Sequence, residues 1–220
     1  MKNKTFVRDP GNYQVVMAND FSANSVLLRN DYNVSALMYY VIGHIWRDDT
    51  AFRTHKFTLE ELNELLPEGK QMSPRTAQRM LDAAIKTYVR FKVGKKKRNF
   101  TIFSMTEWDS GAITVTLNDK LMPYLLQLST NFTTVRLQPL LTIGNSNARA
   151  LYLFIQSQHN ACRKLKVSAS ELGEITELPE TKRSKESIGR LLTILKDLDL
   201  LDGNYDGVSL TWRRRVRVVE

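Results

Sequence analysis

The stretch that decides the fold is Thr181-Lys-Arg-Ser-Lys-Glu-Ser-Ile-Gly-Arg-Leu-Leu-Thr-Ile-Leu-Lys-Asp-Leu-Asp-Leu-Leu201. Its apolar residues recur at the spacing that lines one face of a helix, and Ser184 is placed to cap the start. The opposite face carries side chains that can reach DNA phosphates or base edges, namely Lys182, Arg183, Lys185, Ser187 and Arg190. This pattern is typical of a DNA-recognition helix. The alternative, which is more common, is a basic helix end that is merely solvated.

The composition favours an intracellular protein with a polyanionic partner. The 220 residues include 32 Lys and Arg against 23 Asp and Glu, for a formal charge of +9, and both halves of the chain are basic. Cys162 is the only cysteine, which excludes an internal disulfide and suits a reducing compartment. The longest apolar stretch, 36–46, is too short to span a bilayer, and residues 1–12 lack the apolar segment of a signal peptide. We therefore expect a cytoplasmic protein with no membrane partner.

The first half begins with a predicted strand at 13–17, followed by an apolar helix at about 34–46 that Asn33 caps. A short strand at 55–57 leads into the capping box Thr58-Leu-Glu-Glu61, which opens a second helix. Ser73-Pro74 opens a third helix, whose apolar stripe continues through Tyr88 and Val89. The side of this third helix opposite the stripe carries Arg75, Arg79, Lys86 and Arg90.

A basic run then precedes a predicted hairpin. Lys95, Lys96, Lys97 and Arg98 lead into a strand at 99–108, a turn at Asp109-Ser110-Gly111 and a strictly alternating strand over Ile113, Val115 and Leu117. Helix, strand, helix, helix, hairpin is the order of a winged helix-turn-helix. The four cations would contact the DNA backbone as the first wing.

The second half repeats this pattern. Residues 166–172 align with 56–62 at an offset of 110, with the capping box in both copies, and 184–195 align with 73–84 at 111. A turn at 204–207 then predicts a second wing, whose strand carries Arg213, Arg215 and Arg217 on one face. The alternative for these arginines is a charged edge strand that prevents aggregation.

The predicted fold class is therefore α+β, with two tandem winged-helix domains, each a helical bundle with a β-hairpin wing. We place the first domain at 1–118 and the second at 119–220, and we expect the second to be the main DNA-recognition domain.

The segment between the two copies is the most specific part of the chain. It reads Leu121-Met-Pro-Tyr-Leu-Leu-Gln-Leu128, Asn131-Phe-Thr133, Leu137 and Asn147-Ala-Arg-Ala-Leu-Tyr152. It resembles the central segment of the iteron-binding plasmid replication initiators, in which a leucine-Pro-Tyr helix precedes a Phe-Thr strand and an Ala-x-Arg-Leu-Tyr helix. Here Ala150 separates Arg149 from Leu151, so the register departs slightly from that pattern. By spacing, Ala148, Leu151, Tyr152 and Ile155 share one helix face and belong to the core.

The resemblance implies a mechanism. Members of the family bind tandem direct repeats of double-stranded DNA at a plasmid origin, with a recognition helix from each winged domain in the major groove. They open adjacent AT-rich DNA and recruit the host replicative helicase and host initiator. As homodimers, joined through the first domain, they repress their own promoter. On this chain, the resemblance implies a first recognition helix with Arg75, Gln78 and Arg79 and a second with Lys182, Arg183, Ser184, Lys185, Ser187 and Arg190. From their chemistry, we expect Arg183 and Arg190 to contact guanines and Lys182 and Lys185 to contact phosphates.

We expect no catalysis, no metal and no cofactor. The three histidines, His44, His55 and His159, lack the spacing of a rolling-circle initiator's metal site, and the sequence has no phosphate-binding loop. Two binding functions are the alternatives. A dimeric winged-helix transcription regulator would bind an inverted repeat, whereas a protein-binding tandem winged-helix scaffold would be expected to be acidic or neutral.

Overall fold

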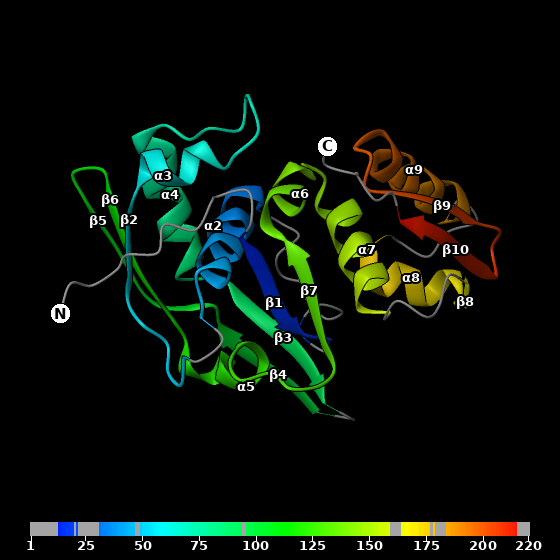
Figure 1. Cartoon of the computed structure of the whole chain (residues 1–220), viewed down its shortest axis with the longest axis horizontal. Helices are drawn as coiled ribbons and strands as arrows, with labels where there is room; N and C mark the ends of the chain where they lie inside the picture. The colour runs from blue at the N-terminus through cyan, green and yellow to red at the C-terminus, as the bar shows by residue number, and fades with distance from the viewer. Residues whose placement is uncertain are drawn as a thin grey trace.

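Helices and small antiparallel sheets alternate along the chain, which places it in the α+β class (Figure 1). A computed structural model describes residues 13–19, 21, 31–46, 49–93, 96–158, 164–176, 178 and 184–214. For residues 90–93, 96–98, 184 and 214 it describes the backbone alone. The prediction of a mixed helix and sheet fold is confirmed.

Helix α2 (Tyr32–Gly43) is the centre of the first half and is buried from Val34 to its last residue. A helix that is apolar on all sides has to be covered on all sides. Asp31 caps it, because its Oδ1 accepts the N–H of Asn33 at 2.8 Å and that of Val34 at 3.3 Å. The predicted cap, Asn33, is wrong: Asn33 already lies in the first turn, and a capping side chain must precede it.

A two-stranded sheet brings distant parts of the chain together beside α2. Strand β1 (Gln14–Ala18), at the predicted position, pairs antiparallel with β7 (Phe132–Arg136), so that Val15 lies opposite Val135. Along the chain, two short helices precede β7, namely η3 (Asp119–Leu121) and α5 (Met122–Leu125). Helix α6 (Leu137–Thr142) follows β7 at once and packs on α2.

The next elements match the predicted strand, helix and helix. They are β2 (His55–Thr58), α3 (Leu59–Glu64) and α4 (Pro74–Ala84). The capping box is confirmed, since the Thr58 N–H donates to Glu61 Oε2 at 2.6 Å and the Glu61 N–H donates to Thr58 Oγ1 at 3.1 Å. Ser73 caps α4 as predicted.

The chain after α4 differs from the prediction. The helix ends at Ala84, and Tyr88 and Val89 begin strand β3 (Tyr88–Val93), which pairs with β4 (Lys96–Thr101). At Ile102 the chain leaves strand conformation, and β5 (Phe103–Asp109) follows as a separate strand. The predicted helix through Val89 and the single strand at 99–108 are therefore wrong. The reason is the β-branched and aromatic composition of residues 87–91, which favours a strand.

The hairpin predicted around Asp109-Ser110-Gly111 is confirmed. Strands β5 and β6 (Ala112–Leu117) join β2 in a sheet of order β2-β6-β5. Ser110 and Gly111 make the turn with φ angles of 48° and 95°, the left-handed region that glycine adopts without strain.

The second half repeats the order of the first. Helix α7 (Ser146–Ser157) leads to strand β8 (Lys164–Lys166), helices α8 (Ala169–Thr176) and α9 (Ser184–Asp197), and the hairpin of β9 (Leu201–Tyr205) and β10 (Ser209–Arg214). These strands form a sheet of order β8-β10-β9. Helix α9 buries the predicted core face, consisting of Ile188, Leu191, Leu192 and Leu195.

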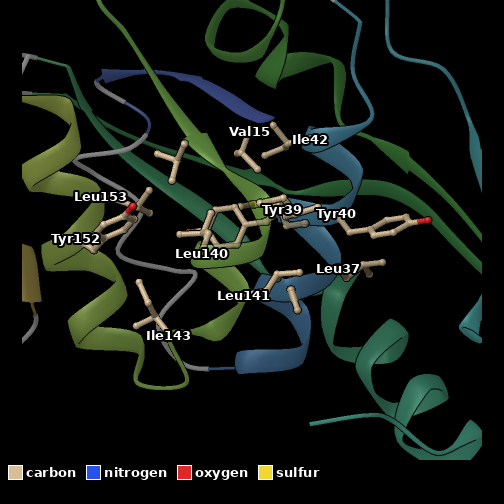
Figure 2. Close-up of a cluster of buried hydrophobic side chains, with 14 of the residues drawn as sticks. Val15, Leu37, Tyr39, Tyr40, Ile42, Leu140, Leu141, Ile143, Tyr152 and Leu153 are labelled. Atoms are coloured by element: carbon tan, nitrogen blue, oxygen red, sulfur yellow. The ribbon is translucent and has the colours of Figure 1, made fainter. Parts of the chain in front are cut away.

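Helix α7 packs against both halves of the molecule (Figure 1). Every residue from Ala148 to Ile155 is buried, because α7 contacts β7 on one side and α8 and α9 on the other. Figure 2 shows Tyr152 and Leu153 of α7 in one cluster with side chains of α6, α2 and β1. The predicted core residues of this helix are confirmed as buried.

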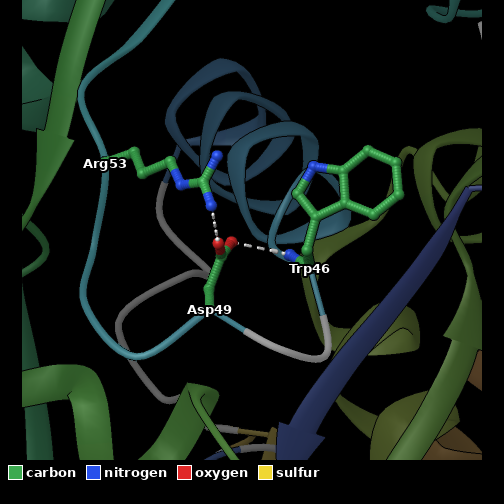
Figure 3. Close-up of polar contacts among 3 residues, drawn as sticks. All are labelled: Trp46, Asp49 and Arg53. Atoms are coloured by element: carbon green, nitrogen blue, oxygen red, sulfur yellow. Dashed lines mark hydrogen bonds and ion pairs between the residues drawn. The ribbon is translucent and has the colours of Figure 1, made fainter. Parts of the chain in front are cut away.

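The connection from α2 to β2 is held by one buried carboxylate (Figure 3). Asp49 Oδ2 accepts the backbone N–H of Trp46 at 2.9 Å, and its Oδ1 lies 2.7 Å from Nη2 of Arg53. The Asp49 side chain is only 5% exposed, whereas that of Arg53 is 71% exposed. The Asp49 carboxylate therefore links the backbone of Trp46 to the side chain of Arg53.

Candidate nucleic-acid interface

Helix α4 presents a polar, cationic face to solvent. Arg75, Gln78 and Arg79 are exposed, while Ala77, Met80, Leu81 and Ala84 on the opposite face are buried. The three- and four-residue spacing explains the division, because such residues share one side of a helix. The three predicted contact residues thus lie together on one exposed surface.

Helix α9 has the same division. Lys185 and Arg190 are exposed and Ser187 is half-buried, and a Cβ placed on Gly189 would meet nothing within 4 Å. The surface around Gly189 is therefore open enough for another molecule to approach closely. The backbone of Ser184 begins the helix, and the predicted residues Lys182 and Arg183 lie outside the described residues.

The turn of the β9–β10 hairpin lies beside the first turn of α9. Asp206 Oδ1 accepts the N–H groups of Val208 and Ser209 at 2.8 and 2.7 Å, and Gly207 has a φ of 108°. A Cβ on Gly207 would lie 3.9 Å from Cδ of Lys185. The hydrogen bonds from Ser209 and Val208 hold the pKa of the Asp206 carboxyl below its usual value, so it is ionised at neutral pH. The Asp-Gly pair in the sequence predicted this turn. Its position next to Lys185 could not be predicted from the sequence.

Arg213 of the second hairpin lies away from the turn of that hairpin. Arg213 is exposed in β10, opposite Asp202 of β9, and Asp202 forms an ion pair of 3.4 Å with Lys196 at the end of α9. Arg213 is four residues from the start of β10, which corresponds to about 13 Å along a strand. The predicted residues Arg215 and Arg217 lie outside the described residues.

The basic run of the first half belongs to a different hairpin from the one predicted. Lys96, Lys97 and Arg98 lie in β4, which pairs with β3, whereas the hairpin that joins β2 is β5–β6. The assignment of this run to the strand of the first wing is therefore wrong. It forms part of an additional hairpin inserted after α4, and Lys95 lies outside the described residues.

Two histidines, His44 just after α2 and His55 at the start of β2, interact electrostatically. The His44 ring lies 4.4 Å from that of Tyr13 and 4.3 Å from that of Tyr40, and its Nδ1 lies 2.7 Å from the Tyr40 carbonyl oxygen. Burial, with a smaller contribution from His44, lowers the pKa of His55 below its usual value. Within the described ranges, no three His, Cys, Asp or Glu side chains gather in a group that could hold a metal ion.

A protein-family model agrees with this arrangement. The model described as Initiator Replication protein, WH1, matches residues 14–156, which is more than half of the chain. The chain belongs to this family of replication initiators.

Solved structures resemble this initiator in fold at low sequence identity. The crystal structure of Pi initiator protein in complex with iteron DNA aligns with a TM-score of 0.70 at 15% identity, over 94% of this chain and 99% of that one. A structure of domains 2 and 3 of RctB aligns with a TM-score of 0.53 at 12% identity, over 86% of this chain and 83% of that one. No curated protein matches the sequence.

The family match also crosses the boundary that we predicted at residue 118. It includes β7, which pairs with β1, and α7, which packs against both halves of the initiator. In the part of the chain that the structure describes, no helix has both the length and the apolar character needed to cross a membrane.

Proposed function

We propose that this replication initiator binds tandem direct repeats of duplex DNA, iterons, at a plasmid origin. The observation that carries the proposal is the repeated order of elements, in which each copy contains an exposed cationic helix, α4 in the first and α9 in the second. A DNA-binding winged helix places such a helix in the major groove. The likeness to Pi, whose structure was solved with iteron DNA, supports the same partner here.

In this proposal the chain consists of two tandem winged-helix modules. The first contains β2, α3, α4 and the β5–β6 wing, and the second contains α7 to β10. Since β7 pairs with β1 and α6 packs on α2, we extend the first module past residue 118 to about residue 142. Helix α7, as the first helix of the second module, then joins the two.

The roles of the contact residues follow from their chemistry. Arg183 and Arg190 would make bidentate contacts to guanine, because the guanidinium group matches the O6 and N7 acceptors. Lys182 and Lys185 would contact phosphates, and so supply affinity that depends on salt but not on sequence. On α4, Arg75, Gln78 and Arg79 would have the corresponding roles.

Origin binding is the first step of the proposed activity. The initiator would then open adjacent AT-rich DNA and recruit the host replicative helicase and host initiator in the cytoplasm. A homodimer, joined through the first module, would repress the initiator's own promoter. We propose that all these steps use binding energy alone, without catalysis or a cofactor.

Footprinting on the DNA that flanks the initiator's own gene tests the proposal. We expect protection of several direct repeats, each about 20 base pairs long, since two recognition helices in successive major grooves cover roughly two turns. Protection of one inverted repeat alone would instead identify a dimeric transcription regulator. Absence of protection in any flanking segment would exclude both functions.

A further inference from the structure

A lysine from the first half lies against the start of the second half. Lys70 is in the turn between α3 and α4, three residues before the Ser73 cap. Its Nζ lies 5.4 Å from the centre of the Tyr32 ring, and its Cε would lie 3.7 Å from a Cβ built on Gly144. Gly144 is exposed and immediately precedes the cap of α7. The cation of the α3–α4 turn therefore lies beside the N-terminus of α7.

The N-terminus of α7 is itself electropositive. Asn145 caps the helix by accepting the Ala148 N–H at 2.9 Å, and the first turn contains no acidic residue. The 12 residues of α7 align their peptide dipoles, with the positive end at Ser146 and Asn147. These two residues are partly exposed, so another molecule can reach that end.

A buried guanidinium group lies beneath the same point. Arg149 is 2% exposed and reaches back toward the helix start, where its Nη2 donates to the Ile143 carbonyl oxygen at 2.6 Å. Its carbon Cζ lies 5.0 Å from the centre of the Tyr32 ring, so this ring interacts with both cations. Within the part of the chain that the structure describes, Nε and Nη1 of Arg149 have no hydrogen-bond partner.

Among the described residues, neither Lys70 nor Arg149 forms an ion pair with an acid. A buried guanidinium usually has a carboxylate partner, because an unpaired buried charge is costly. The nearest acid in the sequence to Tyr32, Asp31, accepts two N–H groups of α2. Two cations and a helix N-terminus converge here, which is the arrangement that proteins use to hold a phosphate.

We propose that Lys70, Gly144 and the first turn of α7 form a binding site for one phosphate group of the DNA backbone. Lys70 contacts the phosphate directly, the backbone of Gly144 permits close approach, and Arg149 adds positive potential from below. This site rests on the proposed function and adds a specific contact to it. One phosphate would contact both the turn before recognition helix α4 and the first helix of the second module. Binding of that phosphate therefore couples the orientations of the two modules.

Three variants of the full chain test the site. Lys70→Gln removes the direct cation. Asn147→Asp places a negative charge where the phosphate would lie, although an acid in the first turn favours the helix itself. Lys120→Gln is the matched control, since Lys120 is an exposed lysine in η3, outside α7 and the α3–α4 turn.

The measurement is binding to a labelled random-sequence duplex of about 40 base pairs, long enough for the proposed two-turn footprint, at several salt concentrations. We expect Lys70→Gln to weaken binding about threefold to tenfold at low salt and to reduce the slope of log K against log salt by about 0.9, the value for one phosphate. Asn147→Asp should weaken binding by a similar factor while its melting temperature stays equal or rises. Lys120→Gln should match the wild type.

The outcomes separate the site from the proposed function. If the wild type binds the duplex and both Lys70→Gln and Asn147→Asp keep its affinity and salt slope, the phosphate site is excluded and the DNA-binding function stands. If Asn147→Asp weakens binding only together with a loss of melting temperature, and Lys70→Gln has no effect, the N-terminus of α7 has a structural role alone. If the wild type binds neither this duplex at low salt nor a duplex that contains the flanking direct repeats, the proposed function fails and the site fails with it.

Discussion

At the scale of single residues, Arg190 should determine specificity. It is exposed on α9, opposite the buried face that contains Leu191 and Leu192. If its guanidinium reads a guanine, Arg190→Ala should reduce the discrimination between repeat and random DNA by roughly 1–3 kcal/mol. The measurement is the ratio of dissociation constants for the two DNAs at one salt concentration.

The control for Arg190 lies on the same helix. Lys196 is paired with Asp202 near the C-terminal end of α9, away from the N-terminal end that we propose enters the groove. Lys196→Ala should leave the ratio unchanged. An equal loss of affinity for both DNAs in Arg190→Ala would reassign Arg190 to a phosphate contact.

His55 should make stability depend on pH. Burial lowers its pKa in the folded protein, so the folded state favours the neutral ring, while the unfolded chain has the ordinary value of about 6.5. A depressed histidine pKa means that the unfolded state binds more protons, and stability is therefore lost as pH falls through 6.5 toward the folded pKa. We expect urea unfolding to show this loss between about pH 7 and 5, and His55→Gln to show a smaller loss. An unchanged pH dependence in His55→Gln would assign it to other groups.

The exposure of single residues could be predicted from the sequence where helical spacing determines which side chains face solvent. The exposure of Arg75, Gln78, Arg79 and Arg190 follows from the apolar stripe on the other side of each helix. The burial of Arg149 did not follow, because a cation in a helix is normally solvated. The apolar neighbours of Arg149 in Ala-Arg-Ala-Leu-Tyr indicate its burial only if the helix is known to be packed on two sides.

At the scale of elements, capping and turn chemistry located the repeated units, but not the insertion between them. The capping box at Thr58 and the Asp-Gly turn at 206–207 are local patterns, and the structure has both. The β3–β4 hairpin was missed because Tyr88 and Val89 continue the helical phase of α4. These two residues pair with residues 100–101 of β4, and the spacing of apolar residues along the chain cannot reveal such a non-local interaction.

The packing of β9 on α9 makes a prediction at this scale. A Cβ on Gly203 would lie 2.8 Å from Cδ2 of Leu192, on the buried face of α9, and 3.4 Å from the Thr211 carbonyl oxygen of β10. Gly203→Ala should therefore lower the free energy of unfolding by about 1–3 kcal/mol through overpacking. Urea denaturation measures the change. Gly189→Ala is the control, since nothing lies within 4 Å of its Cβ and alanine favours a helix. Similar stabilities for the two variants would contradict the packing.

At the scale of the whole molecule, the chain is tied together by contacts that join its two halves. Asn19, just after β1, accepts the hydroxyl of Thr133 at 2.6 Å and donates to the Ser157 carbonyl oxygen of α7 at 3.3 Å. The internal repeat indicated two similar units but not these links, because they join segments outside the repeated pattern. The boundary that we predicted at residue 118 rested on the repeat alone and took no account of these links.

The central position of α7 predicts cooperative unfolding of both halves. Leu153 is fully buried and lies with Leu140, Ile143 and Tyr39 in the cluster of Figure 2, while α7 also packs on α8 and α9. Leu153→Ala removes apolar contacts and leaves a cavity, which should cost about 2–5 kcal/mol. Because both halves depend on α7, hydrogen exchange measured by mass spectrometry should show a similar loss of protection in α4 and in α9. Loss confined to one of these helices would mean that the halves unfold independently, and that α7 does not couple the orientations of the two helices that we propose contact DNA.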